Sequence, residues 1–403
     1  MHYCGELFNW SLAFMRRVGY FDQHRLAGLF LISPIFLCLT AYYRTYVIRN
    51  DFDEVIVNLF KISGATVTTA RTFIVMYKAQ KFLNFFESID KWYQELQVLF
   101  ANRKSNFIFI YYLLTFLFNL YFQCEGNEIT LNKAHEYTRK IKKATKTVLI
   151  LTSITLFYVI FIQLLATVGV GYKKLLVDVA FPGIDLYKSP FWEIMSIMQS
   201  LCIAPITLFS YVSYFCLFLI AIAFGIFLMK DLQSKLESMN DMTDVEALEC
   251  INKCVKDHIM IIKYHNDLEV LFSVGSSADV CIFGIIPCVI IVFSTMDHDM
   301  SLLIADIQLS LMVMISTFII FWVANNFCCE SEKIANAAYN CNWEDRNKEF
   351  RKYIPLIIII SQRPLQLTAG GLKPINMEFF LTMVRCTYSL FTVLITMKTE
   401  GDS

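Results

Sequence analysis

The chain has 403 residues, of which 56% are hydrophobic and 17% are charged, and its mean hydropathy is +0.51. Soluble domains carry about 25% charged residues, so this composition favours a membrane protein. The 35 basic and 35 acidic residues balance, which removes any bulk electrostatic reason to expect nucleic-acid binding. The 13 Cys show no framework spacing, so we infer no disulfide scaffold.

Apolar stretches long enough to cross a bilayer, at about 20 residues, recur seven times along the chain. We expect membrane-spanning helices near residues 26–46, 55–77, 147–170, 191–228, 268–293, 302–324 and 374–397. The fourth stretch is too long for the bilayer alone, so its C-terminal end should project into water. No internal repeat is visible. Residues 1–403 are therefore predicted to form one all-α, polytopic membrane domain.

Lys and Arg residues predict the orientation of these spans. With the N-terminus in the cytosol, the inner side holds 24 Lys and Arg and the outer side holds six. Cytoplasmic loops carry the excess of these residues, so we expect a cytosolic N-terminus, and seven spans then place the C-terminus outside. A seven-helix G-protein-coupled receptor, the alternative, has the opposite orientation. Its Glu/Asp-Arg-Tyr and Asn-Pro-x-x-Tyr motifs are absent from the third and seventh spans.

Residues 98–123 do not fit this pattern. The stretch 107–123 is apolar enough for an eighth span, which would reverse the orientation of everything after it. Val98 can be encoded by a codon beginning GT, and the Tyr-Phe-Gln at 121–123 by a pyrimidine tract ending in CAG, as at the two ends of an intron. Our working interpretation is a retained-intron insert in a cytosolic loop. An interfacial helix and a true span are the alternatives.

Polar residues gather in the outer halves of the second, third, fourth and sixth spans, among aromatic and aliphatic neighbours. An apolar cavity with a few polar points is suited to a small volatile molecule, although any helical bundle mixes such residues. The candidate ligand-binding residues are Phe60, Ser63, Gly64, Tyr158, Gln163, Thr167, Met195, Gln199, Ile304 and Gln308.

The last span has a second candidate surface. Val384, Thr387, Phe391, Leu394 and Ile395 share one face by helical spacing. Such a face is normally buried core. In a symmetric or pseudo-symmetric tetramer the same face would line an axial pore, and an apolar ring there would gate by dewetting. Glu400 and Asp402 would attract cations at the outer mouth or belong to a solvated tail.

No catalytic motif is present, so we expect no enzyme activity and no cofactor. Cys250, Cys254 and His258 lie one turn apart along a predicted cytosolic helix. A zinc site needs a fourth ligand and usually a tighter Cys pair, so we expect a buried helix face and no metal. Cys328 and Cys329 lie beside the predicted inner membrane surface and are candidates for palmitoylation.

Three ionisable residues fall inside predicted spans: Lys61, Arg71 and Asp279. Burying them in a membrane is costly, so each is a functional hypothesis. Each would line a water-filled cavity or pack as a hydrogen-bonded interior residue. For Arg71 we favour packing or a side chain that snorkels to the membrane surface, and for Asp279 both interpretations stay open.

The run 361–397 reads SQRPLQLTAGGLKPINMEFFLTMVRCTYSLFTVLITM, in which a Gly-Gly pair and two prolines break the chain before the last apolar helix. It resembles the C-terminal signature of insect odorant receptors, where Gln-Arg-Pro-Leu, Thr-Ala-Gly-Gly and a closing Ser/Thr-Tyr-Ser-x-Phe recur in this order. The signature positions are Gln362, Arg363, Pro364, Gly370, Gly371 and Tyr388. The related gustatory branch ends in Thr-Tyr, five apolar residues and Gln-Phe. Leu394-Ile395 stands in that last place, so a gustatory-type channel is the less favoured alternative.

The resemblance extends to the role of the subunit. The obligate co-receptor of these receptors carries a long insertion between helices 4 and 5, whereas the loop 230–257 is short. The chain therefore resembles a ligand-specific tuning subunit. Such receptors are ligand-gated, non-selective cation channels that assemble with the co-receptor into a hetero-tetramer in the plasma membrane of olfactory neuron dendrites. The resemblance implies a volatile hydrophobic ligand in the outer half, a pore lined by the last helix, and cytosolic parts of helices 4 to 7 joining the subunits.

Overall fold

The computed structural model describes residues 26–50, 52–89, 175, 179–186, 188–206, 213–283 and 300–401, which are predominantly helical. In chain order the elements are α2 (Leu26–Val47), α3 (Phe52–Tyr77), α7 (Phe191–Ile206), α8 (Ser213–Ser238), the 3-10 turn η2 (Met239–Asp241), α9 (Asp244–Phe283), α11 (Met300–Tyr339), α12 (Lys348–Ser361), β1 (Thr368–Ala369), β2 (Lys373–Pro374) and α13 (Met377–Gly401).

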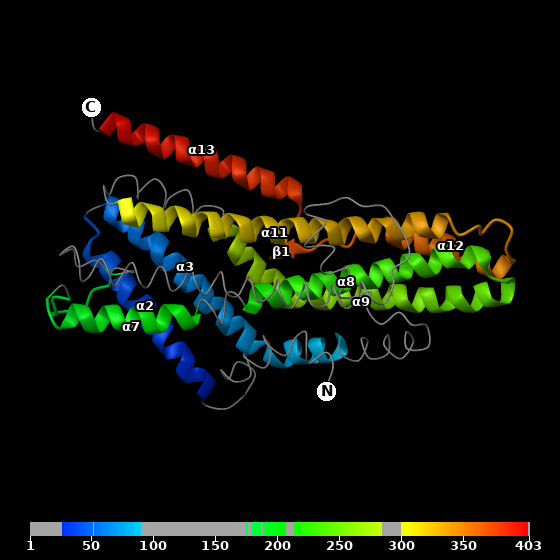
Figure 1. Ribbon diagram of the computed structural model, residues 1–403, viewed down its shortest axis with the longest axis horizontal. Helices are drawn as coiled ribbons and strands as arrows, with labels where there is room; N and C mark the ends of the chain where they lie inside the picture. The colour runs from blue at the N-terminus through cyan, green and yellow to red at the C-terminus, as the bar shows by residue number, and fades with distance from the viewer. Residues whose placement is uncertain are drawn as a thin grey trace.

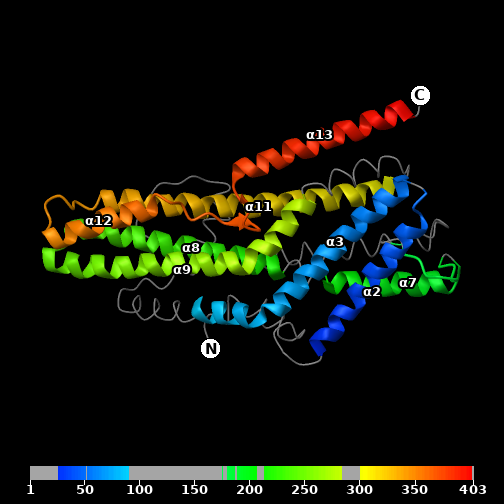
Figure 2. The same ribbon diagram turned by 180° about the vertical axis from the view of Figure 1, so that it is seen from behind.

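Figures 1 and 2 show an elongated molecule with two halves. In one half, α8, α9, α12 and the C-terminal part of α11 lie side by side. In the other, α2, α3 and α7 gather beside the N-terminal part of α11. The last helix, α13, begins near the middle and leans away from α11 toward its C-terminal end (Figure 1).

The length of α9 and α11 connects the two halves. Each has 40 residues, so each is about 60 Å long, roughly twice the ~30 Å hydrocarbon core of a bilayer. The predicted span 302–324 is only part of α11, and the first 16 residues of the span 268–293 form the end of α9, whereas 284–293 lie outside the described residues. The remaining turns pack with α8 and α12 into the first half.

Helices also coincide with other predicted stretches. α2 and α3 cover 26–46 and 55–77 within a few residues, and α13 begins three residues after the start of 374–397. The stretch 191–228 corresponds to two helices, α7 and α8, and residues 207–212 between them lie outside the described part, as do 98–123 and 147–170. Within the described residues, one helical stretch, Leu217–Asp241, is long and apolar enough to cross a membrane by length and composition alone.

Aromatic side chains form the centre of the larger core, where α8, α9 and α11 meet. The rings of Phe218 and Phe272 stack with centroids 4.7 Å apart. The buried Tyr264 donates its hydroxyl to the carbonyl of Ala221 over 2.6 Å, which satisfies its polar atom inside the core. At this point the three helices therefore pack through large rings whose one polar group is hydrogen-bonded.

Gly225 allows α8 to approach its neighbours closely. A Cβ atom at this position would lie 2.4 Å from a ring carbon of Phe327 and 3.0 Å from one of Tyr264. Only glycine therefore fits at this crossing without a shift of one of the rings.

A smaller core lies in the other half, between α2, α3, α7 and the segment 175–186. Its buried apolar residues are Leu37, Ala41, Ile62, Leu175, Val179, Leu186, Trp192 and Met195. Asn58 is buried beside this cluster and donates to Thr45 Oγ1 over 3.1 Å. This cluster positions two of the candidate ligand-binding residues on α7.

Candidate functional site

The signature segment between α12 and α13 forms a short hairpin that is docked on α9. β1 pairs antiparallel with β2, with Thr368 opposite Pro374 and Ala369 opposite Lys373. Gly370 and Gly371 make the turn with φ angles of +64° and +75°, a region that favours glycine. Gly370 also donates its N–H to the carbonyl of Ser273 over 3.0 Å. The Thr-Ala-Gly-Gly motif is thus the turn that holds the chain against α9.

The start of α13 is fixed by α11. Asn376 caps the helix by accepting the N–H of Phe379 at 2.9 Å. The rings of Phe379 and Phe380 both lie 5.7 Å from that of Phe321. The break and the last helix predicted from the sequence are confirmed in this region.

The candidate pore face lies farther along α13. Val384, Thr387 and Phe391 are half-buried, whereas Tyr388 and Val393 are 68% and 53% exposed. Helical spacing places the first three on the same side as Phe380, which contacts α11. The side chains of Leu394 and Ile395 lie outside the described residues. Since α13 leans away from α11 (Figure 1), the described helices give its outer half little cover.

Four of the ten candidate ligand-binding residues lie within the described part. Ser63 and Gly64 on α3 are half-buried, and Met195 and Gln199 on α7 are 8% and 0% exposed. The side chains of Phe60, Ile304 and Gln308, and the residues Tyr158, Gln163 and Thr167, lie outside it. The structure thus places Met195 in the smaller core and buries Gln199 one turn farther along α7.

Sequence reasoning missed Trp192, which lies one turn before Met195 and is buried with an indole N–H for which the described residues supply no hydrogen-bond partner. In the sequence it stands between Phe191 and Glu193 at the start of a predicted span, a place that suggested only the entry of a helix. A buried donor in an apolar cluster is a point at which a polar ligand atom is recognised, so Trp192 joins the candidate ligand residues.

Arg71 is packed in the interior and does not snorkel. It is 2% exposed, and its guanidinium lies 4.7 Å from the centre of the Tyr214 ring, a cation–π arrangement. A cavity of about 20 Å³, room for about one water, lies beside it and is also lined by Ser276, Thr317 and Phe321. The packed interpretation of Arg71 is confirmed, while the side chains of Lys61 and Asp279 lie outside the described residues.

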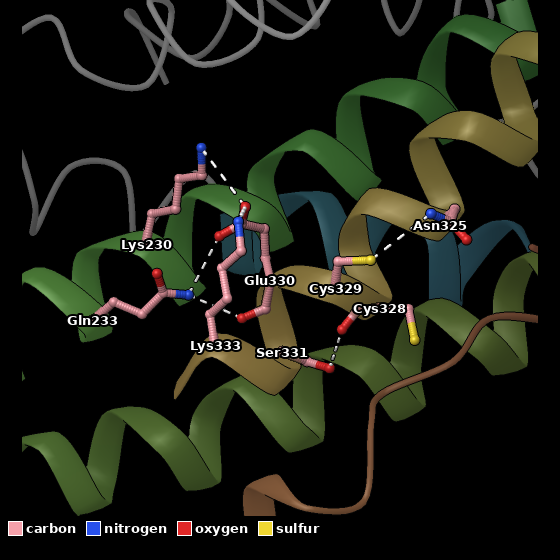
Figure 3. A network of polar contacts seen from close by, with 8 residues as sticks. All are labelled: Lys230, Gln233, Asn325, Cys328, Cys329, Glu330, Ser331 and Lys333. Carbon is pink, nitrogen blue, oxygen red and sulfur yellow. Dashed lines mark hydrogen bonds and ion pairs between the residues drawn. The ribbon is translucent and has the colours of Figure 1, made fainter. Parts of the chain in front are cut away.

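A buried carboxylate joins α8 to α11 in the other half (Figure 3). Glu330 is 9% exposed. Gln233 donates to its side chain at 3.3 Å and to its carbonyl at 2.9 Å, and Lys333 donates to it at 2.8 Å. The next residue, Ser331, donates to Cys328 and accepts the N–H of Leu365 at 3.0 Å. This network connects α8, α11 and the signature segment.

The face of Cys250, Cys254 and His258 is the buried side of α9 that the sequence predicted. Its thiols share a hydrogen bond, which lowers the pKa of Cys250 to about 7 and raises the pKa of Cys254, already raised by burial. Among the described residues, no group of three potential metal ligands gathers. These side chains therefore belong to the packing of α9.

Burial lowers the pKa of His258, and this predicts a pH dependence of stability. The unfolded chain, with a His pKa near 6.5, binds a proton that the folded protein excludes. Stability should therefore fall as the pH drops below about 6.5, by at most ~1.4 kcal/mol per pH unit. Thermal unfolding of the purified protein between pH 5 and 8 measures this. His258→Gln should flatten the curve, and an equal slope in both proteins would contradict the assignment.

Comparison with known proteins gives consistent results. The family model described as 7tm Odorant receptor matches residues 51–388. Odorant receptor 10 of Aedes albopictus is 27% identical over 232 residues, or 56% of this chain and 60% of that protein. Odorant receptor 30a of Drosophila melanogaster is 27% identical over 215 residues, or 53% and 57%. These alignments span about three fifths of each relative.

Two solved structures share the fold. The olfactory receptor OR5 of Machilis hrabei in complex with eugenol superposes with a TM-score of 0.76 over 97% of this chain and 99% of that chain, at 14% identity. A second structure of OR5 gives a TM-score of 0.75 at the same identity, over 96% and 97%. At this identity the likeness concerns the fold alone.

Proposed function

Because the chain belongs to the 7tm odorant receptor family, whose model matches residues 51–388, we propose that it is the odorant-binding subunit of a ligand-gated, non-selective cation channel. It is a transmembrane receptor of olfaction. The proposal includes the channel activity, the seven membrane spans, assembly with a co-receptor into a hetero-tetramer, and a location in the plasma membrane of olfactory neuron dendrites.

The observation that supports this most is the uncovered state of α13. This helix contacts α11 in its first turns and then leans away from it. Leu381 remains 52% exposed, and Val384, Thr387 and Phe391 share a face that is only half-buried. A helix of this kind at the C-terminal end is suited to line a pore that several subunits complete.

The opposite half supports assembly. Leu356 and Ile359 on α12 are 57% and 61% exposed. They lie in the half that the Lys and Arg distribution places in the cytosol. Exposed apolar side chains in water mark a protein contact, so we assign this face to contact between subunits.

Current recording with a co-receptor tests the proposal. Cells that express both chains should pass an odorant-evoked, non-selective cation current that survives blockade of G-protein signalling. Cells that express either chain alone are the controls. A response that disappears with G-protein blockade would favour the seven-helix G-protein-coupled alternative.

Orientation gives a separate prediction. The excess of Lys and Arg on one side predicts that a tag at residue 1 stays hidden in intact cells and that a tag after residue 403 is stained. Staining before and after permeabilisation measures this. The reverse pattern would overturn the span assignment.

Ligand discrimination is expected to depend on Gln199. A volatile molecule gains affinity mostly by apolar burial, at about 25 cal/mol per Å², so ~200 Å² gives roughly 5 kcal/mol before association costs. A buried amide such as that of Gln199 adds little affinity and mainly discriminates between ligands that differ in functional group. Gln199→Leu should therefore reorder the responses to alcohols, esters and hydrocarbons of equal carbon number, with the maximal current largely kept. An equal shift for every ligand would place residue 199 outside the pocket.

A further inference from the structure

One carboxylate on α9 makes two of the contacts that hold the hairpin before α13. Glu269 Oε2 accepts the backbone N–H of Thr368 at 3.1 Å, and its Oε1 accepts the hydroxyl of the same residue. The Thr368 hydroxyl in turn accepts the N–H of Gly371 at 3.0 Å. One side chain on α9 thus holds both the first strand and the turn of the hairpin.

Further hydrogen bonds on both sides of Glu269 hold the hairpin in one position on α9. One turn earlier on α9, Nε2 of His265 donates to the carbonyl of Gln366 over 2.9 Å. One turn later, the carbonyl of Ser273 accepts the N–H of Gly370. A Cβ at Gly370 would lie only 3.1 Å from that of Ser277. The segment 366–371 therefore follows two turns of α9 with backbone and side-chain contacts throughout.

The same turn of α9 is linked to α3. Lys78, just beyond the end of α3, donates to the carbonyl of Val270 over 2.7 Å. Val270 directly follows Glu269. α3 carries two candidate ligand-binding residues, Ser63 and Gly64, so this hydrogen bond connects the helix of those residues to the part of α9 that holds the hairpin.

The hairpin in turn fixes the start of α13. Ile375 donates its N–H to the carbonyl of Leu367 over 2.8 Å, which closes the hairpin two residues before the helix begins. Beyond its first turns, α13 leans away from α11 (Figure 1). Its direction therefore depends on how its first residues are held.

We propose that Glu269 is a positioning residue for channel opening, because its contact with Thr368 makes the start of α13 follow α9. This rests on the proposed channel function. Coupling between two sites requires an element that both of them bias, and the hairpin is that element. Typical coupling corresponds to a 5- to 150-fold change in an equilibrium.

The experiment compares odorant-evoked with ligand-free current in cells that express the full-length chain and the co-receptor. Glu269→Leu and Thr368→Val remove the contact with little change in volume. They should lower the ratio of the two currents at least about fivefold, and the double variant should be no worse than the poorer single one. Thr368→Ser keeps the hydroxyl and should keep the wild-type ratio. Glu249→Leu, on the exposed side of α9, is the matched control.

The ratio of odorant-evoked to ligand-free current distinguishes an effect on the position of α13 from a loss of folded receptor. A variant that only reduces the amount of folded receptor lowers both currents together, and that outcome would overturn the proposal. A wild-type ratio in Glu269→Leu would also overturn it. Hydrogen exchange of the purified protein gives a second measurement, in which Glu269→Leu should speed exchange in 366–376 about tenfold and leave 221–236 unchanged. Unchanged exchange in 366–376 would refute the contact.

Failure of the channel function gives a different result. In that case the wild-type protein itself passes no odorant-evoked current with the co-receptor. Faster hydrogen exchange in residues 366–376 of the Glu269→Leu variant would then still show that Glu269 holds the hairpin on α9. The role of Glu269 in channel opening would be refuted together with the proposed function.

Discussion

Replacing Phe391 with alanine should raise the ligand-free current about tenfold, a shift of ~1.4 kcal/mol in the opening equilibrium. Phe391 shares a face with Val384 and Thr387 and is half-buried in the single chain. In a tetramer, that face would form an apolar ring that closes by dewetting, and a wider ring dewets less readily. Whole-cell recording without ligand, normalised to surface abundance, measures the effect.

Cysteine substitution identifies the face directly. Thiol reagents applied from outside should block conduction through Phe391→Cys or Ile395→Cys. Val393→Cys is the control, because Val393 is 53% exposed on another side of α13 and a reagent there should leave the current intact. Equal block at 391 and 393, or block at neither, would assign the pore to another surface.

A large loss of stability is expected from Arg346→Ala. Arg346 lies between α11 and α12, and its guanidinium contacts the turn between α8 and α9. It donates to the carbonyls of Met239 and Met242 at 2.8 Å and 2.7 Å and to the carboxylate of Asp244 at 2.9 Å. Its side chain is only 11% exposed. Removing it takes away the donor to the Met242 carbonyl, at about 1–3 kcal/mol, while the Met239 carbonyl still accepts the N–H of Met242. We therefore expect a loss of roughly 2 kcal/mol and a lower melting temperature.

Two control variants accompany this measurement. Arg351→Ala removes the same side chain from an exposed position on α12 and should leave the melting temperature within about 1 °C, because surface changes are usually small. Arg346→Lys keeps the charge but lacks the planar fork, so it should recover only part of the loss. Equal melting temperatures for Arg346→Ala and Arg351→Ala would show that the turn is held by other contacts.

The sequence was informative where local chemistry decides the structure. The Gly370-Gly371 turn, the helix that follows it and the buried face of Cys254 and His258 could all be predicted, because turn residues and helical spacing act over a few positions. The packed state of Arg71 was also foreseen, since a charge inside a span needs a partner or a cavity.

Other features depend on contacts between distant segments. Hydropathy windows predicted spans of about 25 residues where α9 and α11 have 40, because charged residues on their outer surfaces lower the average while one side stays buried. The contact of Glu269 with Thr368 joins positions 99 residues apart. A two-residue strand such as β1 has no periodicity that a sequence pattern reveals. Contacts between such distant positions are found only in the folded structure.

The unbroken course of α11 through both halves has a consequence for how such receptors diversify. One residue inserted in the middle of a helix rotates everything beyond it by about 100° and shifts it by ~1.5 Å. In α11 this would turn the half that contains α2, α3 and α7 against the half that contains α8 and α12. In α9, ahead of Glu269, it would carry that carboxylate away from the hairpin. New odour specificities should therefore arise by substitution within these two helices, while changes of length are confined to the segments between helices.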